Sequence, residues 1–313
     1  MSNNIPRPPG ETLSEEEARA MTAGMEEQQS LSHLIPSPKG VLTVLVDTDI
    51  PVYKVAAIAD GKHYLYRGKK YRYKKDAVKA CTDEGNNVSM IEEAYSPWSE
   101  DKAIKALEST LGAWEKAFPG AAFIYCLSSP LNFRYEIFPE YKSARKGKRK
   151  PYHRATLTKY VIEKLNGVTM TGYEADDVVG ILQEQTKAAG VNTPIICSID
   201  KDLLCIPGLH WNPDKGTVNE VSELEAFRNF GEQVLKGDST DSIPGLKRVG
   251  PATATKILAD CDSVESIWDT VRETYLVKKG ESEEYLHQMA SMVWIHRKPG
   301  TTYLDYIGGD KDG

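Results

Sequence analysis

The sequence predicts an α/β protein with a mostly parallel central sheet flanked by helices. Three apolar runs, rich in β-branched residues and without polar alternation, are typical of strands covered on both faces: VLTVLV at 41–46, AAFIYCL at 121–127 and PIICSI at 194–199. Helical stretches separate these runs, as parallel strands need crossover connections. The carboxyl ends of parallel strands share one edge of a sheet, and ligands bind there.

Before the first strand, residues 1–38 are proline-rich and acidic, and we predict a disordered tail because this composition cannot form a core. We place an α/β core at 39–232. Within it, residues 60–95 have the pattern of an insertion, with a hairpin turning at Gly68 and a short helix near Ala77. The interleaved Tyr, Arg and Lys side chains of the insertion suit either contact with DNA by stacking and charge or a solvated hairpin.

The following elements continue the alternation. A helix is expected from Ser99 to Phe118, with Ser99 as its N-cap. A basic segment at about 134–154 then leads into a helix that ends near Gly167. A short strand at Val168–Thr171 precedes the segment GYEADDVVG, which opens another helix.

Composition excludes several classes of protein. The chain has 313 residues, of which 40% are hydrophobic, enough for a sizeable core. Its five cysteines are scattered and lack CxxC spacing, which argues against a disulfide framework or a zinc site and favours a reducing cytoplasm. No apolar run has membrane-spanning length, and the N-terminus lacks a signal-peptide pattern. We expect a cytoplasmic monomer without a membrane partner.

Charge is segregated along the chain. The net charge of −6 would by itself argue against a nucleic-acid partner. However, seven basic residues fall between Tyr141 and Arg154 with no acid among them: Lys142, Arg145, Lys146, Lys148, Arg149, Lys150 and Arg154. A basic patch beside an acidic pocket suits a polyanion that is held for cleavage.

Carboxylates recur where strands end and helices begin. The clusters comprise Asp47; Glu174, Asp176 and Asp177; Asp200 and Asp202; and Asp238 and Asp241. Gathered at one edge, these acids would repel one another unless multivalent cations neutralised them, so the clusters predict a metal site. Taken singly, each cluster also suits a helix N-terminus or a turn. Their coincidence in one chain favours the metal site.

The last third of the chain is predicted to be mainly helical at 233–298, followed by a C-terminal strand and tail at 299–313. The segment IPGLKRVGPATATKIL at 243–258 combines a tight turn with the start of a helix. Gly245 and Gly250 expose backbone N–H groups there, which can bind a phosphate. The neighbouring charges come from Lys247 and Arg248. An ordinary helical hairpin is the alternative.

The order of these motifs resembles the 5′-nuclease (flap endonuclease) superfamily, which includes the 5′-nuclease domain of bacterial DNA polymerase I and the phage 5′-to-3′ exonucleases. The matching segments are VDTD, FRYEIFPEYKSAR, GYEADD, SIDKDLL and GDSTDSIPGLKRVGPATATKIL, and they span about residues 41–260. A free-standing chain of this size with an extra tail is most similar to a phage exonuclease. The resemblance implies a helical arch at the basic segment and a DNA-binding helix–three-turn–helix element at Gly245–Thr253.

The resemblance also implies roles for matched residues. Those implied for one Mg²⁺ are Asp47, Glu174, Asp176 and Asp177, and those for a second are Asp200, Asp202, Asp238 and Asp241, with Mn²⁺ as a substitute. Lys142 and Arg145 would face the scissile phosphate as catalytic residues. The implied DNA-binding residues are Arg134, Lys146, Lys148, Arg149, Gly245, Lys247, Arg248, Gly250 and Thr253. In relatives the helix–three-turn–helix element also binds K⁺ through backbone carbonyls.

One position departs from the family pattern. The family usually has an aspartate six residues before the Phe of its FR pair, and Leu127 stands there in this chain. Leu127 cannot bind a metal. Asp49 is the candidate compensating ligand because it lies closest in sequence to a matched ligand, and the hydroxyls of Ser128 and Ser129, or a looser first metal site, are the alternatives.

The function predicted from the resemblance is two-metal hydrolysis of phosphodiester bonds at DNA 5′ ends, in phage DNA replication, recombination or host DNA degradation. The partners would be nicked, flapped or blunt DNA, an RNA–DNA hybrid where primers are removed, and a replication protein at the N-terminal tail. Two rivals stay open. A haloacid-dehalogenase-type phosphatase would use Asp47 as nucleophile and Asp49 as acid/base, although Pro51 stands where that family prefers Thr or Val. A DNA-end-binding protein with a degenerate active site is the second, and Leu127 motivates it.

Overall fold

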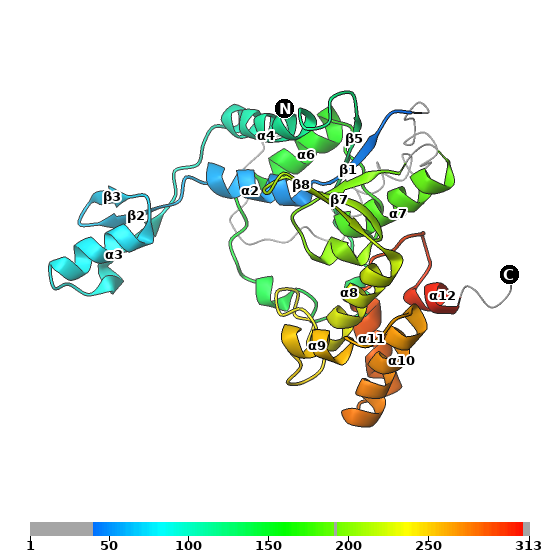
Figure 1. Ribbon diagram of the computed structural model, residues 1–313. Coiled ribbons are helices and arrows are strands. Elements are labelled where there is room, and N and C mark those ends of the chain that lie inside the picture. The colour runs from blue at the N-terminus through cyan, green and yellow to red at the C-terminus, as the bar shows by residue number, and fades with distance from the viewer. Residues whose placement is uncertain (1–39, 191–192, 309–313) are drawn as a thin grey trace. The chain divides into compact units, whose positions relative to one another are not determined.

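The computed structural model describes residues 40–190 and 193–308 (Figure 1). The tail predicted at 1–38 lies outside the described residues. The chain divides into two compact units. Of the described residues, the first comprises 40–48, 120–148, 167–190 and 193–308, and the second comprises 49–119 and 149–166.

The first unit contains a five-stranded sheet in the order β5-β1-β6-β7-β8. Its strands are β1 (Thr43–Asp47), β5 (Ala122–Cys126), β6 (Ile195–Cys197), β7 (Gly208–Asn212) and β8 (Thr217–Val221). β1 pairs in parallel with β5 and β6, and β6 with β7, whereas β8 is antiparallel to β7. Every residue of β1 is buried, as its unbroken apolar run predicts. The predicted mostly parallel sheet is confirmed.

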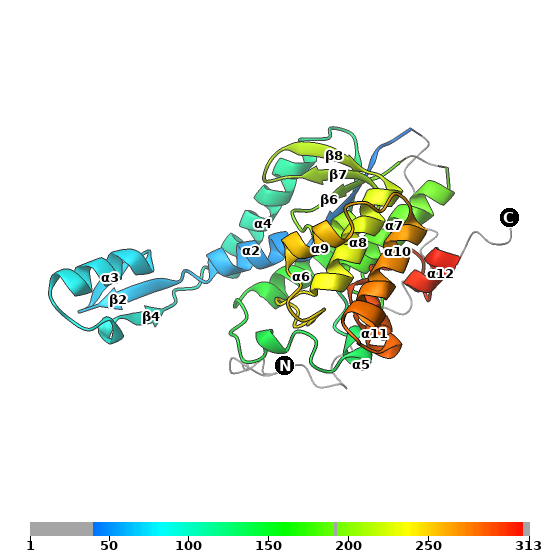
Figure 2. The ribbon, with the colours of Figure 1, turned by 60° about the horizontal axis from the view of Figure 1, so that its bottom comes forward.

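The helices of the first unit supply the rest of its core. They are α5 (Arg134–Ile137), η3 (Ser143–Arg145), α7 (Ala175–Ala188), η4 (Asp202–Cys205), α8 (Glu223–Lys236), α9 (Pro251–Ile257), α10 (Val264–Glu273), η5 (Thr274–Lys278), α11 (Glu283–Val293) and α12 (Tyr303–Gly308). α7 packs on β1 and β5, and α8 packs against α9, α10 and α11 (Figure 2). The domain boundary predicted between 232 and 233 therefore falls inside α8.

Two predicted strands are wrong. The run Val168–Thr171 makes only one bridge to the sheet, between Val168 and Cys126. The strand predicted in 299–313 is replaced in the structure by α12. Thr302 begins this helix, because its N–H donates to Asp305 Oδ2 at 2.7 Å and its hydroxyl accepts from Leu304 N at 3.2 Å. The ring of Tyr303 is buried in the hydrophobic core, which fixes the helix in place.

The helical arch predicted at 134–154 is also wrong for this structure, since the segment before α6 contains only α5 and η3. Its sequence explains the lack of a long helix. Pro139 and Pro151 interrupt it, and Lys142 (φ 55°) and Gly147 (φ 76°) adopt left-handed backbone conformations. The run of basic side chains also has no acid at helical spacing to offset its repulsion.

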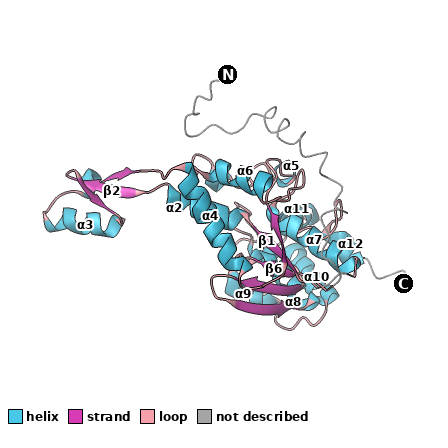
Figure 3. Cartoon of the chain, turned by 90° about the horizontal axis from the view of Figure 1, so that it is seen from above, coloured by secondary structure: helices cyan, strands magenta, loops and turns pink. Residues whose placement is uncertain are grey.

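The second unit combines three packed helices with a small sheet and its own helix. The helices α2 (Asp49–Ala59), α4 (Glu100–Glu115) and α6 (Arg154–Lys164) pack against one another. The sheet has the order β3-β2-β4, with β2 (His63–Tyr66), β3 (Lys69–Tyr71) and β4 (Glu92–Ala94). α3 (Lys74–Asp83) packs on this sheet (Figure 3), and η2 (Val88–Met90) precedes β4.

The hairpin and the following helix predicted within 60–95 are present, and the structure adds the strand β4. That this segment is an insertion stays a prediction. Arg67 and Gly68 both have positive φ (48° and 75°), the conformation of a tight two-residue hairpin turn. All five cysteines are free and buried, in agreement with the absence of a disulfide framework. Within 40–190 and 193–308, every helix is too short or too polar to cross a membrane.

A candidate metal centre at the carboxyl edge of the sheet

The centre begins at the carboxyl ends of two neighbouring parallel strands. Asp47 is the last residue of β1, and Asp200 follows β6. Ser198 connects them, because its hydroxyl donates to Asp47 Oδ2 at 2.9 Å and accepts from Asp200 N at 2.9 Å. Because β1 and β6 are neighbouring parallel strands, their carboxyl ends lie at the same edge of the sheet. Asp47 and Asp200 therefore lie close together, as the sequence predicts.

α7 carries a further cluster to the same edge, because this helix packs on β1. Glu174 is its N-cap and Asp176 lies in its first turn. Burial and the nearby charges of Asp47, Asp200 and Glu174 raise the pKa of Asp176 well above its usual range. Asp176 therefore lies within electrostatic reach of acids from three different segments of the chain.

The last two clusters meet around η4 and the turn after α8. Burial, and then the charges of Asp200 and Asp238, raise the pKa of Asp202 to about 6. Gln233 holds this carboxylate from α8, its Nε2 donating to Asp202 Oδ1 at 2.7 Å. Asp238 Oδ1 accepts from Thr240 N at 2.7 Å, which shapes the turn that carries Asp241. The acidic clusters thus form one continuous anionic region.

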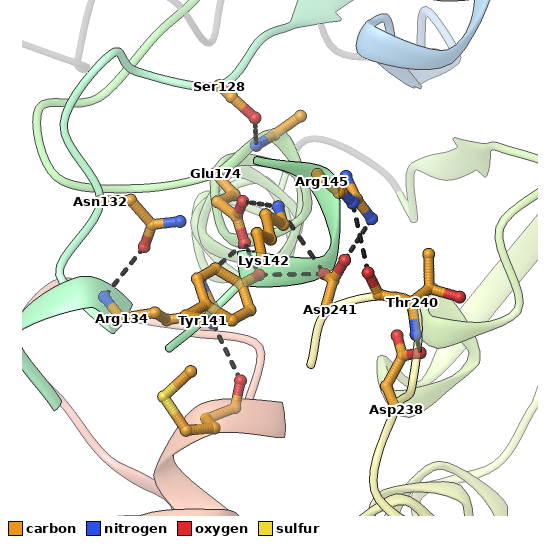
Figure 4. Close-up of polar contacts among 12 residues, drawn as sticks. Ser128, Asn132, Arg134, Tyr141, Lys142, Arg145, Glu174, Asp238, Thr240 and Asp241 are labelled. Atoms are coloured by element: carbon orange, nitrogen blue, oxygen red, sulfur yellow. Dashed lines mark hydrogen bonds and ion pairs between the residues drawn. The ribbon is translucent and has the colours of Figure 1, made fainter. Parts of the chain in front are cut away.

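Protein cations neutralise part of this region, and one phenol donates hydrogen bonds to it (Figure 4). Lys142 forms an ion pair with Glu174 and lies 3.7 Å from Asp241 Oδ2, and Arg145 pairs with Asp241. Burial opposes ionisation of Glu174, but Lys142 and then Arg134 outweigh it and lower its pKa. At Asp241 burial outweighs Lys142 and Arg145, so its pKa is raised.

Tyr141 is a residue of the site that the sequence reasoning missed. Its hydroxyl donates to Glu174 Oε2 at 2.7 Å and lies 3.1 Å from Asp241 Oδ2, and its side chain is buried. Burial and the charge of Glu174 raise the pKa of Tyr141 far above its usual range, so the phenol remains a proton donor. Its place immediately before Lys142 in the basic segment is the signal that could have revealed it.

Arg134 and Asp177 do not have their predicted roles. Arg134 was expected to bind DNA, yet it is only 4% exposed and donates to both oxygens of Asp177. Asp177 was expected to bind a metal, yet its carboxylate also accepts from Glu174 N at 3.1 Å and His296 N at 3.0 Å. Two hydrogen bonds on each oxygen fill the acceptor capacity of the Asp177 carboxylate. The Arg134–Asp177 ion pair therefore has a structural role and positions the start of α7.

Arg149 is also engaged elsewhere. This predicted DNA-binding residue forms an ion pair with the buried Asp60 just after α2, and its guanidinium lies 3.9 Å from the ring centroid of Tyr95. Its charge is therefore used within the second unit. Lys146 and Lys148, by contrast, are exposed.

The Gly-Lys turn lies between α8 and α9. Gly237 and Gly245 (φ 59°) approach so closely that a Cβ on Gly245 would lie 2.3 Å from Gly237 N, which requires glycine there. Gly250 is the N-cap of α9 and Pro251 its first residue, as predicted. The side chains of Lys247, Arg248 and Thr253 are exposed. Their contact with DNA, and K⁺ binding at this turn, stay predictions.

Leu127 places an apolar side chain where the family usually has an aspartate. Leu127 is fully buried, and its N–H donates to Val168 O at 2.9 Å. Ser128 Oγ accepts from Ala175 N at 3.0 Å, and Ser129 Oγ accepts from Leu131 N at 3.2 Å. Both serine hydroxyls therefore accept hydrogen bonds from backbone N–H groups. Asp49 opens α2 in the second unit, and its part in metal binding stays a prediction.

The donor set suits hard divalent cations, because it consists of carboxylate oxygens, the ligands that Mg²⁺ prefers. Within the described ranges, no group of three or more acidic, histidine or cysteine side chains is arranged so that it could hold a metal ion. Lys142, Arg145 and Tyr141 hold the oxygens of Glu174 and Asp241 instead. Burial, and then the charges of Asp47 and Asp200, raise the pKa of Asp176, so a bound cation would favour its ionised form.

The chain is similar to nucleases and polymerases of known function. The family described as "5'-3' exonuclease, N-terminal resolvase-like domain" matches residues 54–211. The exodeoxyribonuclease of Enterobacteria phage T3 is 24% identical over 65% of this chain and 78% of its own length. The 5'-3' exonuclease of Aquifex aeolicus is 31% identical over 51% of this chain and 60% of its own length.

DNA polymerase I of Chloroflexus aurantiacus is 29% identical over 77% of this chain, and the chain spans only 26% of that polymerase. Among solved structures, the bacteriophage T5 flap endonuclease in a complex with DNA and metal ions superposes with a TM-score of 0.49 at 15% identity. The match covers 80% of this chain and 88% of that one.

Proposed function

We propose that this chain, which belongs to the 5'-3' exonuclease family, hydrolyses phosphodiester bonds at the 5′ ends of DNA with divalent metal ions. One observation carries the proposal: carboxylates from five places in the chain form a single anionic region. These places are β1, the segment after β6, η4, the start of α7 and the turn after α8. Lys142 and Arg145 form ion pairs with acids of this region. Such a region beside cations suits a metal-dependent reaction on a phosphate.

The metal ligands we propose are the acids whose oxygens face this region: Asp47, Glu174, Asp176, Asp200, Asp202, Asp238 and Asp241. Asp177 is excluded because Arg134 and two backbone N–H groups saturate it. When bound, two Mg²⁺ or Mn²⁺ ions lower the pKa of a water and stabilise the departing 3′-oxygen. Ser198 and Gln233 orient Asp47 and Asp202 for this role.

Lys142 and Arg145 exchange partners in this proposal. Their charges now balance Glu174 and Asp241, and a divalent ion on those acids makes that balance unnecessary. The two side chains are then free to face the scissile phosphate and offset the charge that develops on it. Tyr141, hydrogen-bonded to the same two carboxylates, keeps both acids oriented during the exchange.

The rest of the DNA is held by exposed cations. Lys146 and Lys148 extend the basic surface next to Arg145, and Lys247 and Arg248 supply charge at the Gly-Lys turn. The same phosphodiester chemistry extends to the RNA strand of an RNA–DNA hybrid. We propose that this activity serves phage DNA replication, recombination or host DNA degradation, since each of these processes removes nucleotides from DNA ends.

Release of label from 5′-labelled DNA tests the function. Nicked, flapped and blunt duplexes and an RNA–DNA hybrid are incubated with and without Mg²⁺. The proposal expects Mg²⁺-dependent release from the DNA substrates, abolished in Asp176→Ala while duplex binding in EDTA persists. Binding without release by the unaltered chain would instead indicate a DNA-end-binding protein. A covalent aspartyl adduct trapped by beryllium fluoride would indicate a phosphatase.

A further inference from the structure

The small sheet of the second unit has a basic, tyrosine-rich surface that the proposed function leaves unused. We define this tyrosine–lysine surface by Tyr64, Lys69, Lys70, Tyr71, Arg72, Tyr73, Lys74 and Lys75. We propose that it binds single-stranded nucleic acid, as a contact additional to the carboxylate centre. This inference goes beyond the proposed function, because it concerns binding at a separate place in the chain.

Charge in this part of the chain is unbalanced. Residues 62–79 contain one acid, Asp76, and eight basic residues: Lys62, Arg67, Lys69, Lys70, Arg72, Lys74, Lys75 and Lys79. The three cations outside the tyrosine–lysine surface are paired: Lys62 with Glu93, Arg67 with Glu84 and Lys79 with Asp83. Across the described parts of the chain, no carboxylate forms an ion pair with the five cations inside it: Lys69, Lys70, Arg72, Lys74 and Lys75.

Two tyrosines of the surface are half-buried neighbours in the small sheet. Tyr64 and Tyr71 are directly opposite each other in the β2–β3 ladder, so they share one face of the sheet. Lys69, two residues before Tyr71, lies on the same face, with its ammonium 5.3 Å from the ring centroid of Tyr71. A base stacked on such a ring would bring its phosphate near a cation.

Tyr73 is the most exposed ring of the surface. Its residue is 52% exposed at the N-cap of α3, and Arg72 and Lys75 lie 5.4 and 5.7 Å from its ring centroid. Cation–π contacts of this kind hold the charges beside the ring. An exposed aromatic ring between two cations is typical of sites for single strands, where stacking and charge combine without reading sequence.

The fold of the insertion does not depend on the exposed ring of Tyr73. Tyr66 is 2% exposed and fills its interior, with its hydroxyl donating to Glu84 Oε2 at 2.8 Å. Ala77 and Cys81 of α3 are fully buried. Glu93 is directly opposite Tyr64 in the β2–β4 ladder and so shares the face of Tyr64 and Tyr71. However, Asp83, Glu84 and Glu93 already pair with Lys79, Arg67 and Lys62, which lie outside the tyrosine–lysine surface. The excess of cations at residues 69–75 and the exposed ring of Tyr73 favour a bound polyanion with unpaired bases over a duplex, whose bases are already stacked.

The charge of the surface is tested by direct binding. A fluorescein-labelled oligo-dT is titrated with the full chain in EDTA, and anisotropy is recorded over a range of salt concentrations. The variant Lys69→Gln/Lys70→Gln/Arg72→Gln is compared with the charge-conserving Lys69→Arg/Lys70→Arg/Arg72→Lys. Three lost phosphate contacts should reduce the slope of log K against log salt by about 2. The charge-conserving variant should keep the slope.

The rings are tested separately. Tyr73→Ala should weaken oligo-dT binding about tenfold, and Tyr73→Phe, which keeps the ring, should bind as the unaltered chain does. Unchanged affinity and slope in the glutamine variant would overturn the inference. Equal losses in Tyr73→Ala and Tyr73→Phe, or displacement of oligo-dT by a polyglutamate peptide as readily as by unlabelled oligo-dT, would overturn it as well. Because no step requires cleavage, failure of the nuclease proposal would leave these results intact.

Discussion

The guanidinium of Arg134 and the carboxylate of Asp177 form a buried bidentate ion pair, with Nη1 2.6 Å from Oδ2 and Nη2 3.0 Å from Oδ1. Arg134 also donates to the backbone oxygens of Met292 and Trp294, at 3.0 and 2.8 Å. The pair therefore ties α5, the start of α7 and the segment after α11 together. It fixes the helix turn that presents Glu174 and Asp176 to the anionic region.

Arg134→Met should destabilise the protein by about 3–5 kcal/mol, because it leaves the Asp177 carboxylate buried without its partner. The measurement is urea unfolding followed by circular dichroism. The double variant Arg134→Met/Asp177→Leu removes both charges and should recover much of the loss. A single variant as stable as the unaltered chain would contradict the supporting role.

Lys142→Ala should lower kcat about 100-fold with a smaller change in KM, since its charge is proposed to act on the phosphate during the reaction. Steady-state cleavage of a 5′-labelled duplex measures both constants. Lys159→Ala is the matched control, because Lys159 is an exposed lysine paired with a glutamate one turn away. A rise in KM alone would mean that Lys142 only binds substrate.

Asp49→Asn should raise the Mg²⁺ concentration required for half-maximal cleavage, if Asp49 replaces the carboxylate absent at Leu127. Activity is measured across a Mg²⁺ titration. Asp101→Asn serves as control, because Asp101 is likewise an acid in the first turn of a helix of the second unit. An unchanged titration in Asp49→Asn would rule out its participation.

His210 should make the folded state sensitive to mild acid. Burial and the nearby charge of Lys187 lower its pKa, and its Nε2 lies 2.8 Å from Ile206 O. The unfolded chain therefore binds a proton more readily than the folded protein, and the stability contributed by neutral His210 is lost as pH falls through the unfolded value of about 6.5. Thermal unfolding at pH 7.5 and 5.5 should show a smaller drop in Tm for His210→Gln than for the unaltered chain. An equal drop would exclude this histidine as a source.

The sheet and the gathering of the acids followed from the sequence, because both depend on local patterns with a strict geometric consequence. The apolar run ending in Asp47 had to be a buried strand, and its end had to meet that of β6. The hairpin at Gly68 was equally local. In contrast, the roles of Arg134 and Asp177 depend on His296 and Trp294, which lie more than a hundred residues away in the chain.

The remaining errors have the same origin. From sequence alone, Arg134 in its basic segment suits DNA binding and Asp177 in its acidic cluster suits metal binding. The tertiary structure buries the two side chains against each other instead. α12 was missed because its stability comes from burying Tyr303 in the core, which a short C-terminal pattern does not reveal. The arch was expected from resemblance, while the residues themselves, with two prolines and left-handed positions, disfavour a long helix.

The positions of bound divalent ions test the candidate metal centre most directly. Crystals grown with Mn²⁺ and measured at the manganese absorption edge would locate them by anomalous scattering. We expect peaks among Asp47, Asp176 and Asp200 and beside Asp202 and Asp241, with Lys142 displaced from Glu174. Peaks confined to other surfaces, or none at these acids in a protein that still cleaves DNA, would contradict the proposed centre.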